Sequence, residues 1–300
     1  MIKVAGRGSG FDVSEGALTH GLPYLAFGSG QPLVFLRWFT PDHANPTGWQ
    51  RTSEIRTLAP LARHFRVYAV GRAPGMAMGT TMADIATQHA EAIRAEFGSA
   101  VNVLGVSSGG SVALQLAADH PDVVRMLVVA SSGDTLPMTA KRAQMSYANA
   151  VAAGRRGLHH TAPVMVRSRT LARLAAAILW LADPLARPEN PADTAAFLQA
   201  EDSFDISERL GEITAPTLVV GGELDAFYPV ETFRRTADRI PNAQLTIYRR
   251  TGHQGVVKHK LFAQDVISFI GANDRHPTNS HTEKHVEERA HVTESVRPSR

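Results

Sequence analysis

The pentapeptide Gly105-Val106-Ser107-Ser108-Gly109 is the segment whose residue types and spacing best suit catalytic chemistry. It follows the apolar run 101–106 and precedes an alanine- and leucine-rich segment, which indicates a turn between a buried strand and a helix. A serine in such a strained turn needs glycine two positions away on either side, so that neighbouring backbone can pass closely. Ser107 meets this requirement and Ser108 does not, because Val106 lies two positions before Ser108. We predict that Ser107 is a nucleophile.

A serine hydroxyl is a weak nucleophile until a base takes its proton, so a histidine and a carboxylate that orients it are also needed. Among the thirteen histidines, His253 is the best candidate. It lies in the segment 251–255, between the strand-like run 245–248 and the last helical pattern. Gly252 and Gly255 flank it, so the imidazole can project from a loop at the edge of a sheet.

Asp225 is the predicted carboxylate partner of this histidine. It ends the segment 221–225, which directly follows the apolar run 217–220 and precedes the next helical pattern. Two alternatives remain open at this point. Glu223, in the same segment, is one alternative carboxylate, although its position also suits an exposed turn residue. Asp134, which follows another strand-like run, is the second alternative.

The elements that must position these residues are short apolar runs that alternate with helical patterns. Runs rich in valine and leucine suit strands that are buried on both faces, and their alternation with helices predicts an α/β fold with a mostly parallel sheet. The runs are 33–36, 67–70, 101–106, 123–130 and 217–220. The helical patterns cover 83–97, 111–119, 230–240 and 256–270, and Gly98 is a stop signal for the first of them.

The alternation is interrupted between residues 134 and 211, where apolar residues recur at helical spacing and no strand is evident. We interpret 134–211 as a helical insertion, called the lid below, between a first core segment, 1–133, and a second, 212–272. The remaining segment, 273–300, is rich in charge and poor in apolar residues. It cannot bury enough surface to offset its ordering entropy, so we predict a disordered tail.

The sequence resembles the α/β-hydrolase superfamily over nearly its whole length to Ile270. The chain order Ser107, Asp225, His253 is the order of that superfamily and differs from the orders in chymotrypsin and subtilisin. Segments 24–36, 71–93 and 215–229 are similar to its second and third strands, to the stretch after its fourth strand, and to its acid-bearing strand. The resemblance implies an α/β-hydrolase fold, with helices on both faces of the sheet and a helical lid inserted after strand 6.

The resemblance also implies an oxyanion hole, with one backbone N–H from Ser108 and one from the loop after the third strand. Many members carry His-Gly in that loop, whereas this sequence has Arg37-Trp38. Aligning the two pairs makes Phe39 the second donor, with Trp38 as the alternative. A tryptophan where glycine is usual is expected to restrict the backbone and to narrow the pocket.

Together these residues predict a cofactor-independent serine hydrolase that acts on small to medium carboxylic esters through an acyl-enzyme. The same triad also suits cleavage of C–C bonds, lactone opening or perhydrolysis, and a ligand-binding protein on a hydrolase scaffold is an alternative of another class. A serine at position 107 argues against dehalogenase and epoxide-hydrolase chemistry, which the superfamily performs with a carboxylate nucleophile.

Composition excludes several other classes. The chain of 300 residues is 44% hydrophobic and 20% charged, as in globular proteins, and has no cysteine for thiol catalysis, thiolate zinc sites or Fe–S clusters. It has no His-Glu-x-x-His motif and neither of the usual glycine-rich nucleotide-binding motifs, so we expect no metal and no cofactor. Without a long apolar segment or a signal-like N-terminus, a cytoplasmic protein with no membrane span is expected.

The net charge of +3 is distributed unevenly. Residues 141–187 contain eight basic residues and one acidic residue, whereas 188–212 contain seven acidic residues and one basic residue. We expect the two halves to face each other or to be solvated separately, and an unpaired basic half would attract an anionic substrate or a lipid surface. Aromatic and basic residues do not alternate as they do in a stacking platform, so we expect no nucleic-acid partner. The expected partner is the small-molecule acyl substrate that the triad predicts.

Overall fold

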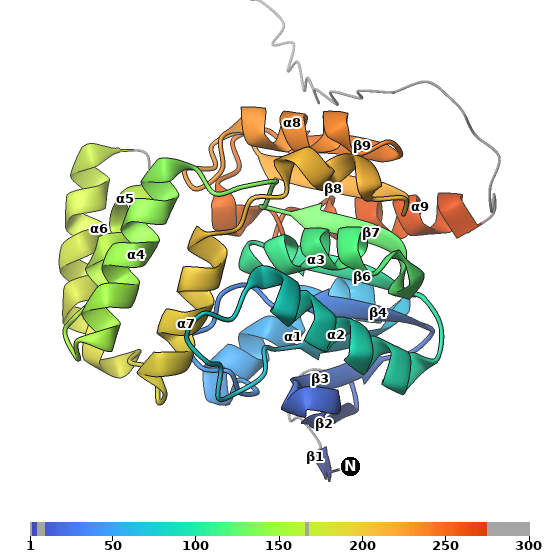
Figure 1. Ribbon diagram of the computed structural model, residues 1–300, viewed down its shortest axis with the longest axis horizontal. Coiled ribbons are helices and arrows are strands. Elements are labelled where there is room, and N and C mark those ends of the chain that lie inside the picture. Colours follow the sequence, from blue (N-terminus) through green and yellow to red (C-terminus); the bar gives the residue numbers. More distant parts are fainter. Residues whose placement is uncertain (1, 5–9, 166–167, 275–300) are drawn as a thin grey trace, which may run out of the picture.

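The computed structural model describes residues 2–4, 10–165 and 168–274. Within these residues nine strands form one sheet in the order β1-β2-β3-β5-β4-β6-β7-β8-β9 (Figure 1). The six strands from β5 to β9 in this order are parallel, and β1, β2 and β3 extend the β5 edge with antiparallel pairing. The strands are β1 (Ile2–Val4), β2 (Val13–Ala17), β3 (Pro23–Gly28), β4 (Gln31–Leu36), β5 (Phe65–Val70), β6 (Val101–Val106), β7 (Val124–Ala130), β8 (Thr217–Gly222) and β9 (Ala243–Tyr248).

Helices cover both faces of this sheet, because the parallel strands are apolar on both faces. In β7, for example, Leu127 and Val129 pack toward α2 and α3, whereas Met126 and Val128 pack toward α1 and α9. Helix α8 covers β8 on the same side as α3. The helices are α1 (Gly48–Ala62), α2 (Met82–Phe97), α3 (Ser108–Asp119), α4 (Met138–Ala152), α5 (Ala162–Met165), α6 (Arg169–Ala182), α7 (Pro191–Asp202), α8 (Val230–Arg239) and α9 (Phe262–Asp274).

The predicted α/β-hydrolase fold is confirmed, with differences at the edges of the elements. Helix α2 ends as predicted at Gly98, which adopts a left-handed conformation, and begins with a capping box between Thr81 and Asp84. The last helix begins at Phe262, whereas the sequence pattern predicted a start at residue 256. Val256 is fully buried in the loop before this helix. Its apolar side chain packs in the core near the ends of β8 and β9 and does not belong to a helix.

The lid residues 134–211 lie between β7 and β8 and carry α4, α5, α6 and α7 (Figure 1). Helix α7 lies between α4 and the core, and α6 forms the outer edge of the molecule. An isolated bridge between Thr135 and Asp205 joins the two ends of the lid. The predicted tail, 273–300, falls almost entirely outside the described residues.

Candidate active site

Ser107 lies at the sharp turn between β6 and α3, where its backbone has φ 54° and ψ −124°. This is a strained conformation for a residue other than glycine. The glycines on either side are required by close backbone approach, because a Cβ at Gly109 would lie 2.1 Å from the carbonyl oxygen of Leu36. A Cβ at Gly105 would lie 2.4 Å from the carbonyl oxygen of Gly109. The spacing of the motif therefore has a steric cause.

The structure brings Ser107, His253 and Asp225 into one hydrogen-bonded chain. Oγ of Ser107 lies 2.9 Å from Nε2 of His253, and Nδ1 of His253 lies 2.9 Å from Oδ2 of Asp225. A carboxylate can only accept, so Nδ1 carries the proton and Nε2 is free to accept from the serine hydroxyl. This is the tautomer in which a histidine can act as a base toward serine.

The two alternative carboxylates are engaged elsewhere. Glu223 is exposed and accepts a hydrogen bond from the backbone N–H of Arg250 at 2.7 Å. Asp134 is fully buried and forms a two-pronged ion pair with Arg235, with N–O distances of 2.6 and 2.7 Å. Of the three candidate carboxylates, Asp225 is therefore the one that contacts His253.

Aromatic and hydroxyl groups hold the His253 loop in place. The ring of Phe227 stacks on the imidazole with 4.9 Å between centroids, and Tyr228 lies 6.1 Å away in a near-parallel orientation. Oγ of Ser131, which follows β7, donates to the backbone carbonyl of His253 at 3.0 Å. The residues after β7, β8 and β9 thus fix the position of the imidazole.

The loop after β4, which carries the predicted oxyanion donors, is held by a buried arginine. Arg37 forms a bidentate ion pair with Glu54 of α1 at 2.9 and 3.0 Å, and it also donates to Asn45 at 3.2 Å. Both members of the ion pair are buried. The ion pair with Glu54 therefore anchors the loop to α1, and the guanidinium of Arg37 is occupied by these contacts.

The side chains of the two candidate donors point to different surroundings. Trp38 packs edge-on against Phe35 at 5.3 Å, within the cluster that includes α1 and α9. The ring of Phe39 contacts Tyr147 of α4 and Phe197 of α7, at 5.9 and 6.3 Å. The aromatic ring that faces the lid is thus that of Phe39. Within the described chain, the backbone N–H groups of Trp38, Phe39 and Ser108 donate to no protein acceptor.

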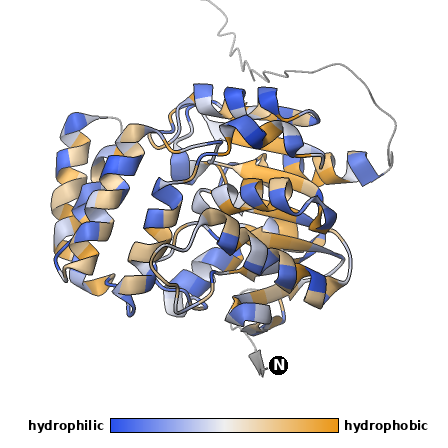
Figure 2. Cartoon of the chain, viewed as in Figure 1, coloured by the Kyte–Doolittle hydropathy of each residue, from blue (hydrophilic) through white to orange (hydrophobic). Residues whose placement is uncertain are grey.

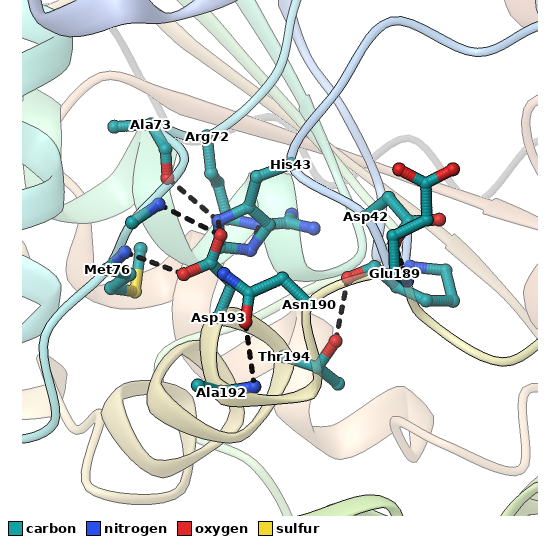
Figure 3. A network of polar contacts seen from close by, with 12 residues as sticks. Asp42, His43, Arg72, Ala73, Met76, Glu189, Asn190, Ala192, Asp193 and Thr194 are labelled. Carbon is teal, nitrogen blue, oxygen red and sulfur yellow. Dashed lines mark hydrogen bonds and ion pairs between the residues drawn. The ribbon is translucent and has the colours of Figure 1, made fainter.

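Arg72, which follows β5, is a buried charge near the site that the sequence analysis did not single out. Its Nε donates to Nε2 of His43 at 3.1 Å (Figure 3), and its Nη2 donates to the carbonyl of Thr40 at 2.6 Å. The guanidinium also stacks 4.0 Å above the ring of Phe197. Burial lowers the pKa of Arg72 to about 10. Burial and the positive charge of Arg72 together lower the pKa of His43 to about 4. His43 is therefore neutral, with its Nδ1 proton donated to the carbonyl of Ala73.

The same network fastens α7 of the lid to two core loops (Figure 3). Both carboxylate oxygens of Asp193 accept from backbone N–H groups, those of Gly75 at 2.9 Å and Met76 at 2.7 Å. Oγ1 of Thr194 donates to the carbonyl of Pro41 at 2.7 Å. The loops after β4 and β5 are thereby held against one end of α7.

Glu201 at the other end of α7 is a second buried charge that the sequence analysis missed. Its carboxylate accepts from Nε2 of Gln144 at 2.9 Å and from Oγ of Ser111 at 3.3 Å, which joins α7 to α4 and α3. Burial raises its pKa to about 7 against the opposing hydrogen bonds and the charge of Arg72. The available signal was its position four residues after the fully buried Phe197, on the apolar face of the helix.

A cavity of about 800 Å³ borders Asp225, one of the three predicted catalytic residues. It is lined by α4, by the turn and helix around α5, and by the residues after β8, including Asp225. Ser107 and His253 are not among its lining residues. Arg142 and His160 contribute basic groups to its wall, and Glu223 and Glu231 contribute acidic ones.

Within the described ranges, no three histidine or carboxylate side chains are arranged to hold a metal ion. Among the same residues, no helix has the length and apolar character to cross a bilayer.

The chain belongs to the alpha/beta hydrolase family, whose sequence model matches residues 18–260. A solved structure of similar fold is MGS-M2, an alpha/beta hydrolase enzyme from a Medee basin deep-sea metagenome library. It superposes with a TM-score of 0.69 at 18% identity, covering 91% of this chain and 98% of the other. This likeness concerns the fold.

Two curated relatives are named as hydrolases. One is the 2-hydroxy-6-oxo-6-(2'-aminophenyl)hexa-2,4-dienoic acid hydrolase of Metapseudomonas resinovorans, 26% identical over 263 residues that cover 82% of this chain and 86% of the relative. The other is the 2-hydroxy-6-oxononadienedioate/2-hydroxy-6-oxononatrienedioate hydrolase of Cupriavidus pinatubonensis, 47% identical over 68 residues. That second match spans 22% of this chain and 24% of the relative's length. The chain is thus an enzyme of the hydrolase class.

Proposed function

We propose that this protein is a serine hydrolase that cleaves carboxylic esters of small to medium size through an acyl-enzyme. The observation that carries the proposal is the chain of two 2.9 Å contacts from Ser107 through His253 to Asp225. It supplies a nucleophile, a base in the required tautomer and a carboxylate that fixes the base.

In the first half of the reaction, Oγ of Ser107 attacks the acyl carbonyl carbon while its proton passes to Nε2 of His253. Asp225 stabilises the imidazolium that forms, and the imidazolium then protonates the departing alcohol. In the second half, His253 takes a proton from water, which attacks the acyl carbon and releases the acid. The proton on Nε2 returns to Ser107, so the enzyme is regenerated without any cofactor.

The tetrahedral intermediate places a negative charge on the former carbonyl oxygen. Backbone N–H groups of Ser108 and Phe39 are the proposed donors to this oxyanion, with Trp38 as the alternative to Phe39. Support comes from the close packing of the loop after β4 on the serine turn, where Gly109 meets the carbonyls of Leu36 and Arg37. The N–H of Ser108 lies at the start of α3, where the helix dipole also favours a negative charge.

Hydrolysis of a C–C bond is a second candidate, supported by the relative from Metapseudomonas resinovorans that matches most of this chain. Its name specifies a 2-hydroxy-6-oxohexa-2,4-dienoic acid derivative as the substrate. The same serine, base and oxyanion hole suit this chemistry, because attack on the 6-oxo carbon also forms a tetrahedral oxyanion.

The two candidates are separated by measuring labelling and turnover in parallel. The protein is incubated with a fluorophosphonate probe, then assayed with short- and medium-chain p-nitrophenyl esters and with a 2-hydroxy-6-oxohexa-2,4-dienoic acid. We expect labelling and ester turnover, and we expect Ser107→Ala to lose both. Ser108→Ala is expected to keep the label, because its buried hydroxyl has no hydrogen-bond partner and its backbone N–H remains.

Labelling with cleavage of the dienoic acid but not of any ester would favour the second candidate. Absence of both labelling and turnover above the level of Ser107→Ala would contradict both, and would favour a binding protein on a hydrolase scaffold.

A further inference from the structure

The outer helix of the lid, α6, exposes a stripe of large apolar side chains. Leu171, Leu174, Ile178 and Leu181 recur at spacings of three and four residues and so share one flank of the helix. Between 56% and 69% of each of these residues is exposed, and Leu185 just beyond the helix is 93% exposed. Figure 2 shows hydrophobic residues along α6 at the edge of the molecule. A stripe of this size on a surface helix marks an interaction site.

Helix α6 contacts the rest of the lid through its small side chains. It packs against α5 and the turn 158–161, yet none of its residues is buried. Its less exposed positions are alanines 172, 175, 176 and 182 together with Leu179. The four side chains of the stripe are thus turned away from the rest of the lid, whereas Leu179 is partly covered.

The opposite flank of α6 is basic. Arg169 and Arg173 are exposed, and Trp180 lies on the same flank, seven residues after Arg173. Nearby, the guanidinium of Arg156 lies 3.8 Å above the Trp180 ring and donates to the Trp180 carbonyl at 2.9 Å. Arg155 adds a further exposed charge. Leucines, a tryptophan and arginines on one short helix are the composition of segments that lie at a membrane surface.

The positive charge of this surface is not balanced by acidic side chains. Between residues 134 and 187 the two acidic residues are Asp134 and Asp183, and both are buried. Within the described chain, no ion pair is recorded between the basic residues of 141–187 and the acidic residues of 188–212. Lys141 does reach the acidic half, where its Nζ donates to the backbone carbonyl of Asp202 and its charge helps to lower the pKa of Asp205. The exposed arginines beside α6 form no such contact among the described residues, so the two arrangements that the sequence allowed both occur, in different parts of the lid.

We propose that α6 and its arginine flank bind the surface of an anionic lipid bilayer. The helix has 14 residues, too few to span a bilayer, so it would lie in the headgroup region with its stripe inserted and its arginines on the lipid phosphates. Helix α5 and the turn 158–161, on which α6 packs, line the cavity beside Asp225 together with α4, so a docked lid would place that cavity near the membrane.

A second copy of the chain would also cover the stripe, but repulsion between the basic flanks of the two copies opposes this arrangement. Two copies would bring exposed arginines together, with no exposed acidic residue from 134–187 between them. The chain's own segment 275–300 is also unsuited, since its apolar residues are three valines and one alanine. Anionic lipid complements both the apolar stripe and the basic flank.

Vesicle sedimentation tests the proposal with the full chain and without any substrate, so its result is independent of hydrolytic activity. Vesicles of phosphatidylcholine alone are compared with vesicles that also contain phosphatidylglycerol, at ionic strengths of about 0.1 M and about 1 M. We expect the protein to sediment with the anionic vesicles at low salt and to dissociate at high salt.

Two double variants separate the apolar and electrostatic contributions. Leu174→Gln/Ile178→Gln should lower the partition coefficient about tenfold or more, and Arg169→Gln/Arg173→Gln about fivefold for each charge removed. These residues are exposed, so folding should be unaffected. The matched controls remove exposed residues outside the lid, in Trp49→Gln/Met78→Gln and Arg56→Gln/Arg63→Gln, and should bind like the unmodified protein.

The proposal is overturned if the protein fails to sediment with anionic vesicles at low salt, or if the control variants lose as much binding as the α6 variants. It is also overturned if light scattering finds a dimer that Leu174→Gln/Ile178→Gln dissociates while no vesicle binding is seen. That last outcome would assign the stripe to a second copy of the chain.

Discussion

The carboxylate of Asp225 lies 2.9 Å from Nδ1 of His253, and its side chain is completely shielded from solvent. Its other oxygen accepts from the backbone N–H groups of Phe227 and Tyr228, at 2.8 and 2.9 Å. A carboxylate fixed in this way is suited to hold the imidazole in a single tautomer and orientation, which is the role we propose for Asp225.

Asp225→Asn is therefore expected to lower kcat by about four orders of magnitude in the ester assay, since an amide in place of the carboxylate disturbs the tautomer of His253. Glu223→Gln is the matched control, because Glu223 is exposed and lies two residues away. Its kcat should stay close to that of the unmodified protein. A near-normal rate for Asp225→Asn would show that another group orients the histidine.

Gly109→Ala is expected to destabilise the protein by about 2 kcal/mol or more and to abolish fluorophosphonate labelling. The new Cβ would lie 2.1 Å from the carbonyl of Leu36, so the serine turn and the loop after β4 must separate. Urea denaturation and labelling are measured together. Gly211→Ala, where a Cβ would meet no atom within 4 Å, should leave both unchanged, and equal effects at the two positions would contradict the steric explanation.

Asp193→Ala should weaken the attachment of α7 to the core. Two backbone N–H groups, those of Gly75 and Met76, lose their carboxylate acceptor, at a cost of about 1–3 kcal/mol for each hydrogen bond to the charged group. We expect a lower urea midpoint and faster proteolysis within the lid. Gln199→Ala changes an exposed residue of the same helix and is the control. Unchanged proteolysis in Asp193→Ala would mean that other contacts hold the helix.

Glu201 should make the stability of the protein fall as the pH rises. Its pKa is about 7 in the folded protein and has an ordinary value of 4.5, so between these values the unfolded chain has already lost the proton that the folded protein retains. The free energy of unfolding then falls by up to about 1.4 kcal/mol per pH unit in this range.

Glu201→Gln removes this dependence, because an amide does not titrate. Relative to the unmodified protein, the variant should be more stable at pH 8 than at pH 5, as measured by urea midpoints. Glu208→Gln, at an exposed position, should show no such change between the two pH values. If the difference in urea midpoint between the unmodified protein and Glu201→Gln were the same at both pH values, the raised pKa of Glu201 would be contradicted.

The positions of Ser107, Asp225 and His253 could be predicted because each lies in the turn or loop after a strand whose apolar run is visible in the sequence. The glycines around Ser107 and His253 are local signals of the same kind. The order of the strands was not visible, and it is the order β6-β7-β8-β9 that places three loops at one edge of the sheet. The serine and the histidine meet although 146 positions separate them.

Arg72 and Glu201 show the limit of such reasoning. Arg72 follows β5 in a glycine- and proline-rich turn, whose sequence predicts only a turn near the edge of the sheet. Glu201 belongs to an acidic stretch that suits a solvated helix face. Arg72 is buried because α7 folds back across the loops after β4 and β5, where Phe197 and His43 enclose the guanidinium. Glu201 is buried because the other end of α7 packs against α4 and α3. No local pattern reports a contact of this kind.

By itself, the sequence determined the fold class, the strained serine turn and the candidate triad, because periodicity and turn chemistry depend on residues within a few positions of one another. Tertiary structure decided which carboxylate reaches His253, which charges are buried and which side of the lid remains apolar and basic. Those properties depend on the packing of segments distant in the chain, since burial and charge pairing are set by neighbours in space.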